Sequence, residues 1–174
     1  MYYIMSKFDT LGTFEFLDSE IEKMKKDVFD SKVIHIQKEW GEWIILIGKI
    51  YKNNGNYTST IHNFLNEMYS EKNLLFKPTM AIEKPFRKTK KECESYFVGG
   101  DIIEDEGFAL SGWETIKWFN NGIIHKDTIS IAMGHYEFRT KETEIKADYT
   151  FVYEKDDRGR LKIISHHSSL PISC

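Results

Sequence analysis

The chain has few cysteines, few prolines and no long apolar segment. Its 174 residues include two cysteines and three prolines. Cys93 and Cys174 have no paired spacing, which argues against a disulfide framework or a thiolate metal site and indicates a reducing compartment. No run of about 18 apolar residues occurs, and the first residues lack the charged and apolar regions of an export signal. We therefore expect a cytoplasmic protein that does not bind a membrane.

The chain also lacks a strong excess of one charge. It has 24 basic and 27 acidic residues, for a net charge of -3, and these are mixed along the sequence. No broad positive field exists to attract nucleic acid. The one basic cluster, Lys84 to Lys91, leads into Glu92 and Glu94, which is typical of the solvated start of a helix. We expect no nucleic-acid partner.

What the chain does contain is typical of one globular domain. Hydrophobic residues make up 41% and aromatic residues 14% of the sequence, which indicates a core or pocket rich in rings. A chain of this length can bury a sufficient core without disulfides or metal. No repeat, low-complexity tract or linker divides it, so we predict a single domain over residues 1–174.

Helical patterns come first in the sequence. Ser19 followed by Glu22 predicts a helix start, and a longer amphipathic stripe predicts a second helix over residues 33–51. A third helix is predicted to begin at Thr58 or Ser59. A short helix is predicted from Thr89, which opens a capping box, to the pair Gly99-Gly100.

Strand patterns dominate the second half. β-branched and aromatic residues alternate between turn signals. Pro78 marks an edge or a bend in its strand, Asn121-Gly122 marks a turn, and Gly134 in mid-strand suggests a bulge or bend. The predicted strands span residues 73–81, 113–124, 128–138, 143–153 and 161–169. Helices followed by antiparallel strands predict an α+β domain, in which a curved antiparallel sheet wraps around the N-terminal helices and leaves a pocket between the layers.

The last strand carries His166-His167-Ser168-Ser169. Side chains alternate between the two faces of a strand, so strict alternation groups His167 and Ser169 with Leu161 and Ile163, and His166 and Ser168 with the opposite face. Adjacent histidines therefore point in opposite directions. A metal site built from this pair is not expected, whereas polar residues at the end of a strand are a common way to line a pocket.

Five motifs occur in order over roughly residues 73–171. They are Phe76-Lys77-Pro78-Thr79, Ser95-Tyr96-Phe97-Val98-Gly99-Gly100, Glu104-Asp105-Glu106-Gly107-Phe108-Ala109-Leu110, Ala132-Met133-Gly134 and His166-His167-Ser168-Ser169-Leu170-Pro171. Together they resemble one known family, the iota-class carbonic anhydrases. This family belongs to the nuclear-transport-factor-2-like (NTF2-like) superfamily and is related to the association domain of calcium/calmodulin-dependent protein kinase II.

The resemblance implies an NTF2-like cone that dimerises through its sheet and hydrates carbon dioxide reversibly to bicarbonate and a proton. It implies a metal-free site with no cofactor, in which Thr79, Tyr96 and either Ser168 or Ser169 hold the substrate. A related His-x-Ser ending favours Ser169. With an ordinary pKa near 6.5, His167 is the candidate for proton transfer.

Two other functions remain open at this level, because this fold carries many activities. One is a non-catalytic module for small-ligand binding or oligomerisation. The other is an enzyme for a larger organic substrate, which would place an Asp or His deep in the pocket. Hydroxyl residues at the matched positions suit a small anion better.

Overall fold

A computed structural model describes residues 10–171, with side chains from residue 17 onward. The chain begins with one long helix, α1 (Thr10–Lys52), followed by α2 (Thr58–Met68), the short strand β1 (Leu75–Lys77), α3 (Lys90–Val98) and a 3-10 turn, η1 (Phe108–Ser111). Four strands complete it: β2 (Thr115–Lys126), β3 (Ile129–Arg139), β4 (Glu144–Lys155) and β5 (Leu161–Ser169). The helix start predicted at Ser19 is wrong, because the two expected helices are one continuous α1.

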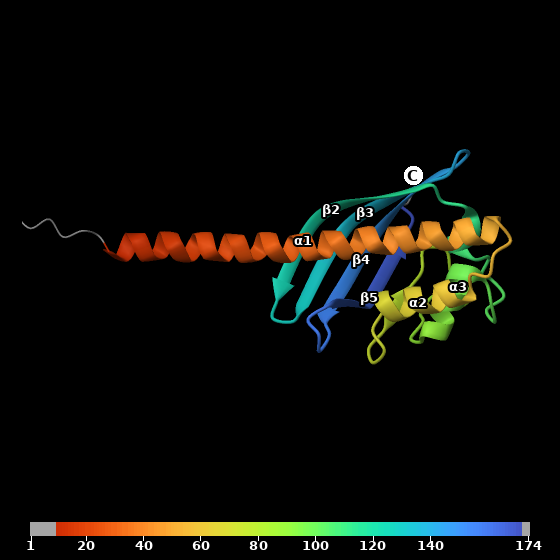
Figure 1. Ribbon diagram of the computed structural model, residues 1–174, viewed down its shortest axis with the longest axis horizontal. Coiled ribbons are helices and arrows are strands. Elements are labelled where there is room, and N and C mark those ends of the chain that lie inside the picture. The colour runs from red at the N-terminus through yellow and green to blue at the C-terminus, as the bar shows by residue number, and fades with distance from the viewer. Residues whose placement is uncertain (1–9, 172–174) are drawn as a thin grey trace, which may run out of the picture.

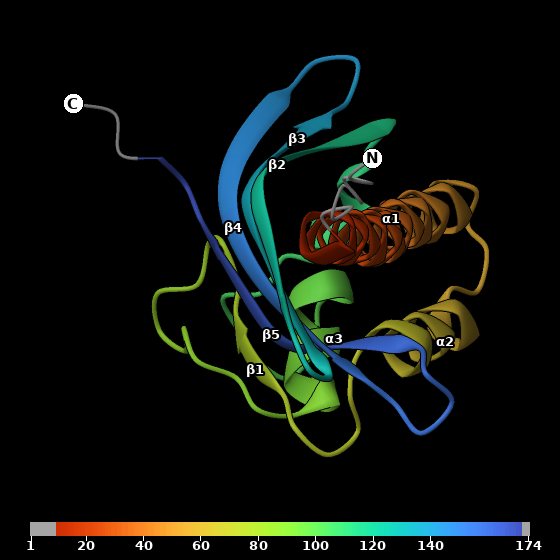
Figure 2. The same ribbon diagram turned by 90° about the vertical axis from the view of Figure 1, so that its left-hand side faces the viewer.

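The five strands form one curved sheet in the order β1-β5-β4-β3-β2. Its β2 to β5 pairs are antiparallel as predicted, but β1 pairs with β5 in parallel, so the sheet is mixed. Pro78 follows β1 at the sheet edge, where its missing backbone donor breaks no ladder. Figure 2 shows the sheet curling around α1, with α1 and α2 on its concave side.

The short helix α3 begins and ends as its sequence predicts. Thr89 and Glu92 form the capping box, with the Thr89 side chain accepting from the Glu92 backbone N–H. Gly99 ends the helix with φ of 76°, a conformation that glycine adopts without a steric penalty. This helix carries Tyr96 into the interior.

The predicted turn at Asn121-Gly122 is wrong, because β2 runs straight through it. Asn120 pairs with Gly134 and Gly122 pairs with Met133, so Asn121 is an extra residue in a bulge. A Cβ at Gly134 would lie 1.9 Å from the backbone oxygen of Phe119, which leaves room only for glycine. The bulge expected at Gly134 thus lies in the strand beside it.

A second bulge lies in β5 and reverses its alternation. Ile163 pairs with Tyr153 and Ser165 pairs with Val152, which leaves Ile164 without a partner. The inward-facing residues are therefore Leu161 and Ile163 before the bulge, but His166 and Ser168 after it.

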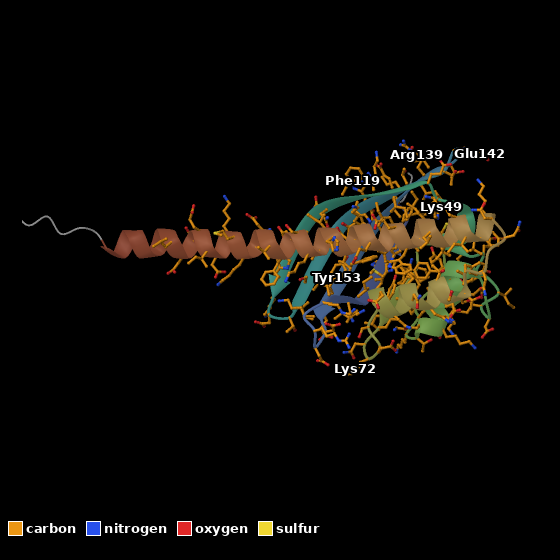
Figure 3. The ribbon with its side chains drawn as sticks, viewed as in Figure 1. Lys49, Lys72, Phe119, Arg139, Glu142 and Tyr153 are labelled. Atoms are coloured by element: carbon orange, nitrogen blue, oxygen red, sulfur yellow. The ribbon has the colours of Figure 1, made fainter. Side chains whose placement is uncertain are left out.

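The core lies between α1 and the concave face of the sheet. One stripe of α1 is buried and packs against aromatic side chains of the strands (Figure 3). Trp40 is at its centre, with its ring 6.2 Å from Tyr136 and from Phe151 and 5.8 Å from His166, between ring centroids. The buried stripe comprises Val33, Ile36, Trp40, Ile44 and Ile47.

Candidate active site

Four hydroxyl groups from separate parts of the chain meet at the end of the sheet. Thr79, just after β1, and Ser168, on β5, have their side-chain oxygens 2.5 Å apart. The Tyr136 hydroxyl, from β3, donates to Ser168 Oγ. Tyr96 on α3 lies close enough to Thr79 for Thr79 to influence its pKa, and both residues line the same cavity. The structure thus brings together three of the residues predicted from the sequence, and Ser168 is the serine among them.

Three of these groups, those of Thr79, Tyr96 and Tyr136, line a small cavity, and Ser168 is hydrogen-bonded to two of them. The cavity offers about 10 Å³ to the centre of a water molecule, which is close to the space that one water needs. Its walls are mostly rings, so the hydroxyls lie in apolar surroundings. The lining residues are Trp40, Pro78, Thr79, Tyr96, Phe97, Phe108, Tyr136 and His166.

A larger pocket of about 560 Å³ adjoins the cavity. Thr79, Tyr96 and Phe108 line both spaces, so they separate the cavity from the pocket. The pocket is also lined by acidic side chains, including Glu106 and Glu142. It is the approach that small molecules have from solvent to the hydroxyl groups.

Burial keeps the phenol groups protonated. It raises the pKa of Tyr96 to about 12, although hydrogen bonds from Thr79 partly oppose the change. Burial also raises the pKa of Tyr136, an effect that the nearby hydroxyls of Ser168 and Thr79 partly oppose. At neutral pH both side chains are neutral phenols that can donate one hydrogen bond and accept others.

His166 lies at the back of the cavity in a defined tautomer. The indole N–H of Trp40 donates to the Tyr69 hydroxyl over 2.9 Å, and that hydroxyl lies 3.0 Å from His166 Nδ1. The indole can only donate, and His166 Nδ1 is the one acceptor that the described side chains offer to the Tyr69 hydrogen. The tautomer that satisfies both groups therefore has Tyr69 donating to Nδ1 and the imidazole hydrogen on Nε2. Burial lowers the pKa of His166 well below 6.5, so the ring is neutral. Among the described side chains, none accepts from Nε2.

The loop that carries Thr79 is fixed by acidic side chains. Glu104 accepts the backbone N–H groups of residues 82, 83 and 84 over 2.7 to 2.9 Å. These bonds lower the pKa of Glu104. Beside it, fully buried Arg87 makes two hydrogen bonds to Asp105, of 2.8 and 2.7 Å, and its guanidinium lies 5.6 Å from the Tyr96 ring centroid. The loop and Tyr96 are thereby held in one arrangement.

Ser169 and His167 lie on the opposite face of the sheet. They line a shallow pocket of about 370 Å³ with Met133, His135 and Asp148. His167 is exposed, and partial burial together with the charge of Lys77 lowers its pKa. The structure therefore does not bring either residue to the hydroxyl groups. The cause is the bulge at Ile164, which strict alternation did not include.

Comparisons with known proteins identify the family of this chain. Residues 31–170 match a family model described as metal-independent carbonic anhydrase. The chain belongs to the metal-independent carbonic anhydrase family. A metal-independent carbonic anhydrase from Nostoc sp. is 35% identical over 156 residues, which cover 85% of this chain and 76% of that protein.

A solved structure supports the same assignment. It is an iota-carbonic anhydrase from a cyanobacterium in complex with bicarbonate, with a TM-score of 0.78 and 36% identity, covering 83% of this chain and 93% of that one. A putative ketosteroid isomerase from Parabacteroides distasonis shares only the fold, at 14% identity and a TM-score of 0.55 over 80% of this chain and 85% of that one. An NTF2-like protein from Shewanella oneidensis is similarly distant. It has 13% sequence identity and a TM-score of 0.53, and the match covers 80% of this chain and 98% of that one.

The protein is thus a carbonic anhydrase with the NTF2-like fold, as the sequence motifs predicted. Its family works without a metal cofactor. Within residues 10–171, no three His, Cys, Asp or Glu side chains are grouped so that they could hold a metal ion. In the same range, no helix is both long and apolar enough to cross a membrane.

Sequence reasoning did not single out His166 or Tyr136 at the cavity. Tyr136 resembles any aromatic residue on the buried side of a strand, and only the fold brings its hydroxyl to Ser168. His166 differs from its neighbour His167 only in which face of β5 it occupies. The signal that decides the face is the bulge at Ile164. That bulge is visible only once the pairing of β5 with β4 is known.

Proposed function

We propose that carbon dioxide is hydrated where the small cavity meets the larger pocket, and that Thr79, Tyr96 and Ser168 hold carbon dioxide and the attacking water there. His166 and Tyr136 complete the hydrogen-bonding surface. The observation that carries this proposal is the contact of 2.5 Å between Thr79 and Ser168, because it joins two segments 89 residues apart into one polar group in apolar surroundings. Hydroxyl groups suit this reaction since each can both donate and accept.

In the reaction, the water oxygen forms a bond to carbon, one C=O bond becomes single, and negative charge grows on the carbon dioxide oxygens. Fixed hydrogen-bond donors stabilise such charge most where water is excluded. The phenols of Tyr96 and Tyr136 stay protonated at neutral pH because burial raises their pKa values. They serve as donors and orienting groups, and not as bases.

We assign His166 a second donor role. Its neutral ring has a hydrogen on Nε2 that meets no acceptor among the described side chains, and the ring lines the cavity. This hydrogen can bond to a bicarbonate oxygen. The proton lost by the attacking water passes to solvent in the adjoining pocket, and bicarbonate leaves by the same route.

The test is a matched pair of serine variants. Ser168→Ala removes the hydroxyl between Thr79 and Tyr136, and carbon dioxide hydration in a stopped-flow indicator assay is expected to fall on the order of 100-fold. Ser169→Ala changes the adjacent residue on the other face and is expected to keep the wild-type rate. Equal hydration rates for the two variants would show that the reaction does not take place at the cavity.

We also propose that the protein is a homodimer that pairs through the outer face of the sheet. Apolar side chains are exposed there, including Phe119, Ile131 and Met133, and such a patch is typical of an interface. Met133→Glu is expected to halve the molar mass measured by light scattering. The cytoplasmic location stays a prediction from the sequence.

A further inference from the structure

The first half of α1 extends well beyond the domain. The helix has 43 residues, which corresponds to about 65 Å, and its N-terminal turns pass the end of the sheet (Figure 1). Every residue from Leu17 to Val28 is exposed, and the side chains drawn on the projecting turns extend into solvent (Figure 3). The match to the family model begins only at residue 31. The projecting part is therefore outside the region that defines the carbonic anhydrase family.

Four large apolar side chains form a line along this part, which we call the seam. They are Leu17, Ile21, Met24 and Val28, and their exposed fractions range from 47% to 66%. Their spacing of four, three and four residues is that of a coiled-coil heptad. At 100° per residue, the seam lies roughly 130° around the helix axis from the buried stripe that faces the sheet. Among the described residues, the domain approaches only the end of the seam, where Val28 lines a groove with Arg160 and Leu161.

The residue types along the seam favour two parallel helices. Ile21 and Val28 take the first position of the heptad, and Leu17 and Met24 take the fourth. β-branched residues at the first position, with leucine-like residues at the fourth, favour a parallel pair over larger assemblies. The seam ends at Ser31 and His35, where the helix reaches the domain.

The charged residues beside the seam also favour a parallel pair over an antiparallel one. In a parallel pair, Glu20 of one helix would lie opposite Lys25 of the other, and Asp27 opposite Lys32. By symmetry, each attraction occurs twice. In an antiparallel pair, acidic positions would face acidic positions and lysines would face lysines. Lys25 now pairs only with Glu22 at the helix surface, an exposed contact of 2.7 Å that is weak enough to be exchanged.

A membrane surface fits the same helix less well. Residues 17–32 carry five acidic side chains (Asp18, Glu20, Glu22, Asp27 and Asp30) against four lysines (Lys23, Lys25, Lys26 and Lys32). Helices that bind anionic lipid have a strongly basic polar face. The balanced charge, with opposite signs at the positions that meet across a pair, fits a second copy of this chain.

We infer that residues 17–32 form a parallel two-stranded coiled coil with the same segment of a second copy. The two domains lie on the outer sides of the pair, because each buried stripe points away from the seam. The helix is already ordered by its attachment to the domain, where His125 meets Asp30 over 2.6 Å, so pairing loses less conformational entropy than it would for a free peptide. This interface is separate from both the active site and the outer face of the sheet, so together with the proposed sheet dimer it joins more than two copies.

The first experiment measures molar mass against protein concentration by sedimentation velocity. Ile21→Glu combined with Met24→Glu places charge in the seam and is expected to halve the mass of the wild-type assembly. Lys23→Gln makes a charge change of the same sign on the side of the helix away from the seam and is expected to leave the mass unchanged. Carbon dioxide hydration by all three proteins is expected to be equal, so the outcome does not depend on the proposed active site.

The second experiment tests direction by exchanging charges. Lys25→Glu alone would set a second carboxylate against Glu20 and is expected to weaken association at least tenfold. Adding Glu20→Lys restores opposite charges only in a parallel pair, and the double variant is expected to regain the wild-type mass. No recovery in the double variant would overturn the parallel arrangement.

A cysteine crosslink adds a direct readout. In a Cys174→Ser background, Leu17→Cys is expected to form an interchain disulfide on mild oxidation, whereas Lys23→Cys, on the side away from the seam, is not. Identical masses for the wild type and the seam variant would overturn the inference. Binding of the wild type to phospholipid vesicles, with loss of binding in the Ile21→Glu variant, would overturn it in favour of a membrane.

Discussion

The two faces of β5 carry the same two residue types in different surroundings. On the inner face, His166 and Ser168 are buried among rings and hydroxyl groups. On the outer face, His167 and Ser169 line a shallow, open pocket. Burial lowers the pKa of His166 well below 6.5, whereas the smaller effect on His167 comes from partial burial and Lys77. The difference shows that burial, more than residue type, gives a histidine next to a serine its chemistry.

The largest expected effect is a difference in carbon dioxide hydration rate between variants of His166 and of His167. His166→Leu is expected to lower the rate of carbon dioxide hydration on the order of 100-fold, because leucine has no donor to replace the Nε2–H of the cavity. His167→Leu, on the outer face, is expected to stay within about twofold of the wild type. Both rates are measured by stopped flow near neutral pH, with thermal melts to verify folding. A larger loss in the His167 variant would reverse the roles of the faces.

A smaller effect is expected from the hydroxyl groups that support Ser168. Tyr136→Phe keeps the ring but removes the donor to Ser168 Oγ, so the rate is expected to fall about tenfold, as for one lost hydrogen bond. Thr150→Val removes a hydroxyl from the outer pocket and serves as the control. The comparison would fail if both substitutions lowered the rate equally.

Acid stability gives a further test of the same difference. The lowered pKa of His166 means that the unfolded chain binds a proton below about pH 6.5 while the folded chain does not. Its contribution to stability is therefore complete above about pH 6.5 and is lost as the pH falls, by about 1.4 kcal/mol per pH unit. Denaturant melts at about pH 7.5 and about pH 5.5 are expected to differ less for His166→Gln than for the wild type or His167→Gln.

The smallest effect is expected from chelation. The family is metal-independent, and the cavity presents hydroxyls and a neutral imidazole. Dialysis against a chelator is expected to leave the hydration rate unchanged, and added zinc is expected to have no effect. A loss that zinc restores would place the chemistry elsewhere than in the hydroxyl-lined cavity.

Much of the fold could be predicted because its signals are local. The capping box at Thr89, the order of helices and strands, and the edge position of β1 beside Pro78 all follow from neighbouring residues. The sequence did not predict that α1 is continuous. Ser19 and Glu22 have the pattern of a helix start, but the same residues are equally acceptable inside an exposed helix. The parallel pairing of β1 with β5 depends on contacts about 90 residues apart in the sequence.

The sequence predicted the residue types of the candidate site, but not which face of β5 each side chain occupies. Thr79 and Tyr96 came from motifs, and the structure brings Thr79 to Ser168 and both motif residues to one cavity. Ser169 was favoured because of a related His-x-Ser ending, which does not show that Ile164 interrupts the alternation of β5 and turns Ser168 inward. Register of this kind is set by the partner strand and by burial of one face, so a single sequence does not reveal it.

The contact between Trp40 and Tyr69 has a consequence for proton movement. A chain of hydrogen bonds can carry a proton onward only if every member can also take one up, and an indole N–H has no lone pair to receive it. The hydrogen-bonded path from His166 through Tyr69 therefore ends at Trp40 inside the core and cannot carry a proton to solvent. In the proposed reaction, the proton and bicarbonate both leave through the larger pocket beside Thr79 and Tyr96, so buffer that enters this pocket is expected to control the rate whenever proton release is slow.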